Sequence, residues 1–146
     1  MMPVIFLDFD GVLNGNDWLS TLPLSLAVTP DFDPACCARL QRIIDATGAV
    51  IVVSSSWRER VRVTWLREVL ANNGIKATVI GVTPIKAYRH EEIQAWLDER
   101  PHVTNYCALD DVALPGLEYN RVRTDERTGL TDADVEKAIA ILRMGE

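Results

Sequence analysis

Two pairs of acidic side chains are the residues of this sequence best suited to chemistry. Asp8 and Asp10 follow a short apolar run near the N-terminus, and Asp110 and Asp111 follow another apolar run about a hundred residues later. Two like charges about 4 Å apart repel by about 4 kcal/mol at an effective dielectric constant near 20, so each pair needs a proton or cation to share. A hard divalent ion with oxygen ligands would meet that need.

An ordinary surface turn is the simpler alternative for the first pair. In that interpretation Asp8 and Asp10 are solvated polar residues, and Gly11 is present only for its backbone freedom. The second pair makes this explanation poor, because the carboxyl ends of parallel strands meet at one edge of a sheet, where ligands bind. The sequence therefore predicts an oxygen-rich Mg²⁺ pocket built from both pairs.

The elements that must position these residues alternate along the chain. Apolar runs of strand length cover residues 3–9, 49–53, 77–82 and 105–109, and a weak alternation over 118–124 indicates a fifth strand. Helical spacing covers 34–47, 57–73 and 90–99, and a last helix opens at 130–132. This order predicts parallel βαβ units in an α/β fold. We expect a three-layer sandwich with a central, parallel, Rossmann-like sheet of about five strands.

The helix over 34–47 has the clearest end signals. Asp33 is a suitable N-cap, Pro34 suits the first helical position, and Gly48 is placed to end the helix. By contrast, Asn14–Phe32 shows no clear periodicity. A long irregular segment in a compact domain is usually functional, so we expect a flap or small insertion at about 14–33 that covers the acidic turn.

Composition narrows the class of protein. A chain of 146 residues with 48% hydrophobic and 25% charged residues is typical of one globular domain. The net charge of −6 disfavours a stable complex with nucleic acid. The arginines of 58–67 alternate with glutamates, which favours a solvated helix face. The three cysteines match neither a disulfide framework nor a metal motif.

No targeting or membrane signal is visible. The apolar run Pro3–Leu7 is too short for a signal peptide or a membrane helix. We therefore expect a cytoplasmic protein without a membrane partner. His90 and His102 lie outside these motifs and are expected at the surface.

With these features in place, the sequence resembles the haloacid dehalogenase (HAD) superfamily. Its pattern is Asp-x-Asp-Gly after the first strand, Ser or Thr after the second, Lys or Arg before the fourth, and an acidic pair after the fourth. All four features occur here in order. More narrowly, the chain is similar to small, capless members related to phosphatase-like domains found with RNA-repair enzymes, through DFDGVLN, SSSWR, TPIKAYRHEEIQAWL, ALDD and TGLT.

The resemblance implies a single HAD-like hydrolase domain over 1–146, without a large cap, that hydrolyses phosphomonoesters through an aspartyl-phosphate. It makes Asp8 the nucleophile and Asp10 the general acid and base. Mg²⁺ would be held by Asp8, the backbone carbonyl of Asp10, and Asp110 with or without Asp111. Ser54 would bind the phosphoryl oxygens, although helix capping is its other explanation.

A cation beside the aspartates is also implied. Lys86 fits the superfamily by residue type, whereas Arg89 fits the narrower group by its place at a helix start, and we favour Arg89. Further candidates for substrate contact are Gly11, Ser55, Arg58 and Trp18. Arg58 could clamp a substrate phosphate or simply lie on the helix face.

Two other functions are compatible with parts of the pattern. A receiver-like phosphoacceptor domain also has an acidic pocket, but its acidic pair comes before the phosphoacceptor in the chain. A catalytically silent HAD-fold binding module would retain the fold without turnover. The expected substrate is a small-molecule or nucleic-acid-end phosphomonoester, since an open pocket without a cap admits bulky substrates.

Overall fold

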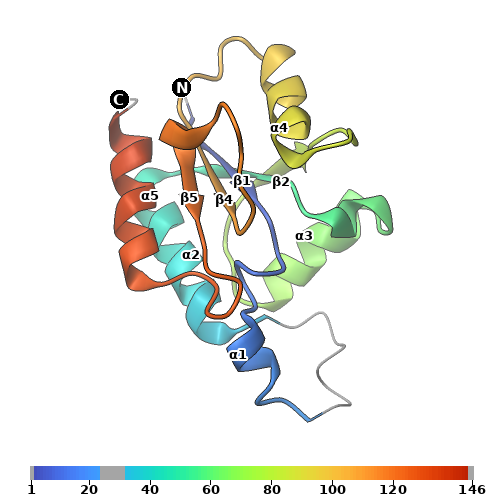
Figure 1. Cartoon of the computed structure of the whole chain (residues 1–146), viewed down its shortest axis with the longest axis vertical. Coiled ribbons are helices and arrows are strands. Elements are labelled where there is room, and N and C mark those ends of the chain that lie inside the picture. The colour runs from blue at the N-terminus through green and yellow to red at the C-terminus, as the bar shows by residue number, and fades with distance from the viewer. Residues whose placement is uncertain (1, 24–31, 145–146) are drawn as a thin grey trace.

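Five parallel strands form the centre of the fold, in the order β3-β2-β1-β4-β5. The computed structural model describes residues 2–23 and 32–144. In Figure 1 the strands lie between the helices, and their bounds are Val4–Leu7 for β1, Val50–Val53 for β2, Val79–Val82 for β3, Tyr106–Asp110 for β4 and Arg121–Arg123 for β5. β1 is central and pairs with β2 and β4. The ends of β1 and β4 are therefore neighbours.

Helices cover both faces of the sheet. Helices α2 (Pro34–Thr47), α3 (Val63–Asn72) and α5 (Asp132–Met144) contribute to one apolar core, and α4 (Arg89–Asp98) contributes to the other. The predicted three-layer α/β sandwich with a parallel sheet is confirmed. None of the helices among the described residues is long and apolar enough to cross a membrane.

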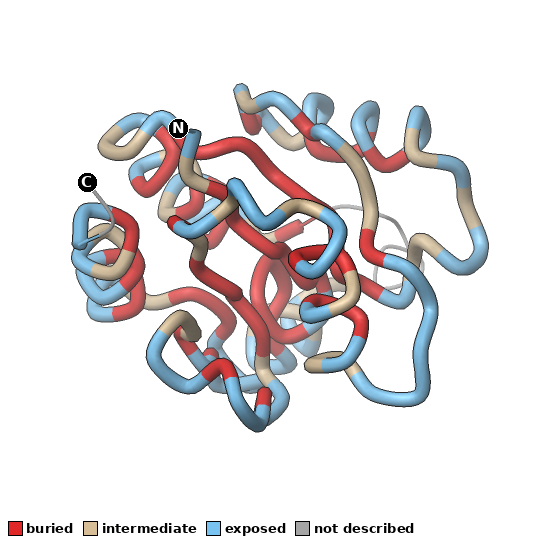
Figure 2. The backbone as a smooth tube through the Cα atoms, turned by 90° about the horizontal axis from the view of Figure 1, so that it is seen from above, coloured by how far each residue is buried: buried red, intermediate tan, exposed pale blue. Residues whose placement is uncertain are grey.

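The central strand is buried on both faces, which explains its uninterrupted apolar sequence. Ile5 and Leu7 belong to the core under α2, α3 and α5, while Val4 and Phe6 belong to the core under α4. The ring of Phe6 meets Trp96 of α4 edge-on, with the ring centres 5.3 Å apart. Figure 2 shows this buried centre as a continuous red interior. A strand covered on both sides needs apolar residues at successive positions.

The sequence signals at the ends of α2 are confirmed. The Asp33 carboxylate accepts a hydrogen bond of 3.0 Å from the Ala35 N–H, and Pro34 is the first residue of the helix. Gly48 follows the last turn with φ of 69°, a left-handed conformation that glycine adopts without strain. Local chemistry therefore determines both ends of this helix.

The helix predicted over 57–73 is wrong in its first part. The structure has a short 3₁₀ helix at Ser56–Glu59, a turn that ends in the extended residue Arg62, and then α3 from Val63. The Ser55 hydroxyl accepts from the Trp57 N–H and starts the 3₁₀ turn, and the Arg58 side chain bends back to bind backbone carbonyls. The predicted solvated face is therefore wrong for Arg58, whose side chain is only 3% exposed.

The strand predicted over 118–124 is shorter than expected. A 3₁₀ turn occupies Glu118–Asn120, and β5 contains only Arg121–Arg123. As the last strand of the sheet, β5 pairs with β4 alone. An edge strand has a solvated side, so its apolar pattern is weak and its bounds are poorly predicted from sequence.

The predicted flap is described only at its two ends. Helix α1 (Asn16–Leu19) follows the acidic turn, and residues 24–31 lie outside the described part of the chain. The backbone N–H groups of Asn16 and Asp17 each donate a 2.9 Å hydrogen bond, to the carbonyls of Glu126 and Arg127. The start of this segment is thereby attached to the loop after β5.

The acidic turn after β1 is attached to the loop after β5 by Thr124. The buried Thr124 hydroxyl donates to the Gly11 carbonyl at 2.6 Å, and the Thr124 N–H donates to the Asp110 carbonyl at 2.9 Å. This residue therefore connects the two acidic segments.

We predict that Thr124→Val lowers the free energy of unfolding by about 1–3 kcal/mol, because the Gly11 carbonyl stays buried without its donor. Urea denaturation of wild type and variant measures the difference. Thr128→Val is the control, since the exposed Thr128 also donates its hydroxyl to a backbone carbonyl, and its effect should stay within about 0.5 kcal/mol. Equal effects of the two substitutions would contradict the prediction.

Candidate active site

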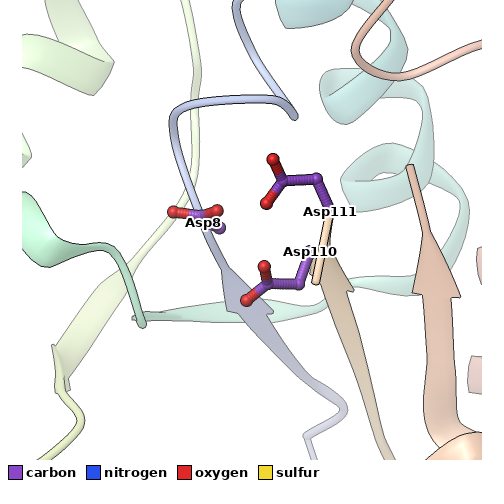
Figure 3. Close-up of side chains that lie close together, drawn as sticks. All are labelled: Asp8, Asp110 and Asp111. Carbon is purple, nitrogen blue, oxygen red and sulfur yellow. The ribbon is translucent and has the colours of Figure 1, made fainter. Parts of the chain in front are cut away.

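Three carboxylates from the two acidic segments meet at the carboxyl end of the sheet. One oxygen from each of Asp8, Asp110 and Asp111 lies within 4.8 Å of the others. Figure 3 shows the three side chains turned toward one space, above the ends of β1 and β4. The in-register pairing of Leu7 with Leu109 places the following aspartates side by side. The convergence predicted from the two sequence segments is therefore present.

The electrostatics of this cluster are unfavourable without a cation. Burial, and next the charge of Asp110, raise the pKa of Asp8 to about 8. Burial also raises the pKa of Asp110 to about 6, against the opposing effect of Arg89. The positive charge of Arg89 does not cancel the effect of burial on these two residues, and both pKa values stay above their usual range. Three closely spaced carboxylates, of which Asp8 and Asp110 are buried and have raised pKa values, fit a divalent ion such as Mg²⁺.

Arg89 is the cationic side chain in contact with the cluster. Its Nη1 donates to Asp110 Oδ2 at 2.7 Å and lies 3.5 Å from Asp8 Oδ1. The Lys86 side chain is exposed, and the hydrogen bond recorded for Lys86 is made by its backbone N–H to Glu92 at 3.1 Å. Of the two candidates, the structure brings Arg89 to the aspartates and leaves Lys86 at the surface.

Asp10 lies apart from the three-carboxylate cluster. Its Oδ1 accepts from Asn14 Nδ2 at 3.2 Å, and its Oδ2 accepts from the indole N–H of Trp57 at 3.0 Å. Asp10 is exposed, whereas Asp8 is buried. The same Asp-x-Asp segment thus holds one carboxylate in the cluster and one in a separate, solvated place. The Asn14 and Trp57 contacts with Asp10 were not predicted from the sequence.

Two buried hydroxyls follow the neighbouring strands β2 and β3. Ser54 Oγ and Thr83 Oγ1 have no hydrogen-bond partner among the described residues. The Thr83 N–H donates to the Val53 carbonyl at 3.1 Å, which places Thr83 beside Ser54 across the sheet. A buried hydroxyl without a partner is costly, so its retention suggests a ligand. Capping is provided by Ser55 instead. Thr83 was not predicted from the sequence, although it too directly follows a strand.

Gly11 makes room for Asp111. It has φ of 81°, and a Cβ added there would lie 2.6 Å from the Asp111 Cγ. A side chain at this position would therefore displace one member of the cluster. Trp18, by comparison, is half-buried on α1, and the hydrogen bond recorded for it is made by its carbonyl, which accepts from Thr21.

A buried ion pair between Arg58 and Glu92 lies next to Arg89. Glu92 on α4 forms an ion pair with Arg58, and its Oε1 lies 3.4 Å from the Arg89 Nε. Arg58 also donates to the carbonyls of Ser55 at 2.8 Å and Thr83 at 2.9 Å. The loops after β2 and β3 are therefore fixed to the helix that carries Arg89. Glu92 had no role in the sequence analysis, because its partners are distant in the chain.

A family model described as "HAD domain in Swiss Army Knife RNA repair proteins" matches residues 4–135. No curated protein and no solved structure matches the chain.

The buried ion pair allows a stability prediction. Glu92→Ala should lower the free energy of unfolding by about 3–5 kcal/mol, because it leaves the Arg58 guanidinium buried without its carboxylate. Thermal and urea unfolding measure the change. Glu91→Ala is the matched control, since Glu91 is exposed on the same turn of α4 and should change stability by less than about 0.5 kcal/mol. A small effect of Glu92→Ala would show that the pair contributes little.

A second prediction concerns pH in the absence of metal. The pKa of Asp8 rises from 3.8 to about 8, so the folded state binds the proton more tightly than the unfolded state does. Stability contributed by this group is therefore lost as pH rises from about 4 to 8. Asp8→Asn removes the titration, so the variant should gain stability relative to wild type across this window.

Unfolding experiments in chelator at several pH values measure this difference. Asp17→Asn, at an exposed position, should follow the wild-type pH dependence. At pH 8, Mg²⁺ at a hundred times its dissociation constant should stabilise wild type by about 2.7 kcal/mol, and Asp8→Asn by less. A wild-type protein indifferent to Mg²⁺ would contradict the assignment of the cluster as a metal site.

Proposed function

The chain belongs to the family of HAD domains found in Swiss Army Knife RNA repair proteins, and from this premise we propose that it is a Mg²⁺-dependent phosphomonoester hydrolase with Asp8 as the nucleophile. The observation that supports this most is the position of Asp8, a buried carboxylate that shares a cluster with Asp110 and Asp111 and contacts Arg89. A surface turn would need no such arrangement.

The metal would be held by carboxylate oxygens of Asp8 and Asp110, with Asp111 as a further ligand and the backbone carbonyl of Asp10 as the remaining proposed one. When bound, Mg²⁺ would neutralise the charge that accumulates on the phosphoryl oxygens and keep the acidic cluster ionised. Arg89 adds a second positive charge beside Asp8 and Asp110. An ionised Asp8 is then available as a nucleophile.

In the first step, a carboxylate oxygen of Asp8 attacks phosphorus, and the bond from phosphorus to the ester oxygen breaks. The leaving oxygen takes a proton from Asp10. The Trp57 indole and the Asn14 amide hold the two oxygens of Asp10 outside the cluster. Asp8 and Asp10 therefore have different surroundings, which is the condition for proposing different roles for the two carboxyl groups.

In the second step, the Asp10 carboxylate removes a proton from water, and the oxygen of that water attacks the phosphorus of the aspartyl-phosphate. The phosphorus–Asp8 bond breaks, inorganic phosphate leaves, and Asp8 is restored as a carboxylate. Asp10 ends the cycle protonated, ready for the next substrate. Protons and bonds therefore balance over the two steps.

The phosphoryl oxygens would be bound by Ser54, whose hydroxyl is buried and without a partner among the described residues, and by Arg89. Gly11 allows the close approach of Asp111. Ser55 and Arg58 would act on the substrate through the loop that carries Ser54, since their side chains bind the protein itself. Trp18 remains a candidate for substrate contact from the segment that follows the acidic turn.

For the substrate, the family description favours a terminal phosphate on a nucleic acid or nucleotide. The net charge of −6 argues against tight binding to a long polynucleotide. Transient binding of only the phosphorylated end of a nucleic acid is compatible with both the family description and the negative net charge.

Phosphate release from a generic aryl phosphate and from phosphorylated nucleotides tests the proposal. Asp8→Asn should reduce the rate by roughly 10³-fold or more, and Asp10→Asn by about 10²–10⁴-fold. Chelation of Mg²⁺ should abolish release, and added Mg²⁺ should restore it. Asp17→Asn, an exposed aspartate, should keep wild-type activity.

A wild-type protein that binds Mg²⁺ but releases no phosphate from any of these esters would favour the catalytically silent module instead. Full activity of Asp8→Asn would exclude this residue as the nucleophile.

A further inference from the structure

A pocket opens beside the carboxylate cluster, between the N-terminal end of α4 and the loop after β4. It has a volume of about 590 Å³, and Arg89 is part of its wall. Arg89 also contacts Asp8 and Asp110, so the pocket and the carboxylate cluster share this side chain and lie next to each other. A volume of this size accommodates a small organic molecule. Its position makes it a candidate site for the part of the substrate that bears the phosphate.

The lining of the pocket combines apolar and cationic groups. Tyr88, Val112, Ala113 and Pro115 form apolar surface. Three cationic side chains line it against two carboxylates, although the chain as a whole carries a net charge of −6. The Arg58–Glu92 pair is internally compensated. Arg89 faces Asp8 and Asp110, which leaves Lys86 and Glu59 as the other charged lining residues. Both are exposed, and no ion pair of Lys86 is seen among the described residues, so its ammonium group can reach an anionic ligand.

Tyr88 gives the pocket a flat aromatic surface. Its ring stacks on His90, with the ring centres 5.8 Å apart and an angle of 18° between the planes. The residue is nevertheless 65% exposed, so the support of His90 on one side leaves much of the ring accessible. An exposed aromatic ring that lines a pocket is suited to stacking with a planar ligand.

We propose that this pocket binds the nucleoside part of a nucleoside phosphate, with the base on Tyr88 and the phosphate at Asp8. The inference rests on the proposed phosphomonoesterase function and adds the place where the nucleoside binds and the residue that recognises its base. An aliphatic phosphate ester would reach Asp8 and Arg89 but would gain nothing from the Tyr88 ring. Tyr88 is thus a specificity-determining residue, and Lys86 is placed to attract a further phosphate of the same ligand.

Substrate comparison in a Tyr88→Ala variant tests the proposal. The ratio kcat/KM is measured with Mg²⁺ for adenosine monophosphates phosphorylated at the 3′ or 5′ position, and for glycerol phosphate. Loss of base stacking should lower kcat/KM for at least one nucleotide by about tenfold or more, mainly through KM. The value for glycerol phosphate should change less than twofold.

Two controls separate stacking from damage to the fold. Tyr88→Phe keeps the ring and should retain the wild-type preference for nucleotides. Tyr119→Ala removes a tyrosine that is 94% exposed and lines a different pocket, so it should leave all substrates unaffected. A Tyr88→Ala variant that loses equal activity on both substrate types, or on neither, would overturn the proposal while the hydrolase function stands.

A binding experiment distinguishes failure of this inference from failure of the proposed function. Binding of adenosine monophosphate is measured by calorimetry in Asp8→Asn, with and without Tyr88→Ala. Weaker binding by about tenfold in the double variant would support the pocket even if wild type released no phosphate. Equal binding by the two proteins would overturn it.

A mononucleotide and the end of a nucleic acid both present a nucleoside that bears a phosphate. A Lys86→Gln variant distinguishes these two ligands. If the ligand is a nucleic-acid end, a short phosphorylated oligonucleotide should have a lower KM than the mononucleotide. Lys86→Gln should raise KM only for the oligonucleotide, with a weaker salt dependence. Equal KM values for the two substrates, unaffected by Lys86→Gln, would identify the mononucleotide as the ligand of the pocket.

Discussion

Mutual repulsion among three carboxylates at one edge of the sheet is the constraint on which this site depends. Parallel pairing of β1 with β4 forces Asp8 and Asp110 together, and burial then makes their ionisation costly. Arg89 partly offsets that cost through its contacts with both residues. Its place is secured by Glu92, which in turn is held by Arg58 and through it by the carbonyls that follow β2 and β3. The same set of contacts therefore positions the positive charge of Arg89 and holds the loops that follow β2 and β3.

The two aspartates of the Asp-x-Asp segment show how a short turn can create unlike environments. The Asp8 side chain enters the cluster, where burial and then the neighbouring negative charges raise its pKa. Asp10, two residues later, is exposed and receives N–H donors from Asn14 and Trp57. Trp57 is itself packed edge-on against Phe9, with the ring centres 5.1 Å apart. Trp57 therefore links the second carboxylate to the aromatic residues of the core, and the two aspartates lie in different surroundings.

The surroundings of the site are built from loops rather than from a large additional domain in the described part of the chain. Residues after β2, β3 and β4 line the pocket beside Arg89, and this open edge explains how a small α/β fold could admit a bulky phosphate ester. Net negative charge over the rest of the chain limits long-range attraction of polyanions. Selectivity would then come from short-range contacts in the pocket, where Tyr88 and Lys86 lie.

The sequence by itself determined the succession of strands and helices along the chain, the ends of α2, and the location of both acidic pairs at strand ends. These features depend on local physics, namely hydrophobic periodicity, capping chemistry and the alignment of parallel strand ends. The tertiary structure decided what depends on distant partners. It brought Arg89 rather than Lys86 to the aspartates, because the contact spans α4 and β4. It turned Arg58 inward to Glu92, 34 residues away, and interrupted the helix predicted there. It also placed Thr83 beside Ser54, since pairing of β2 with β3 is visible only once the sheet has formed.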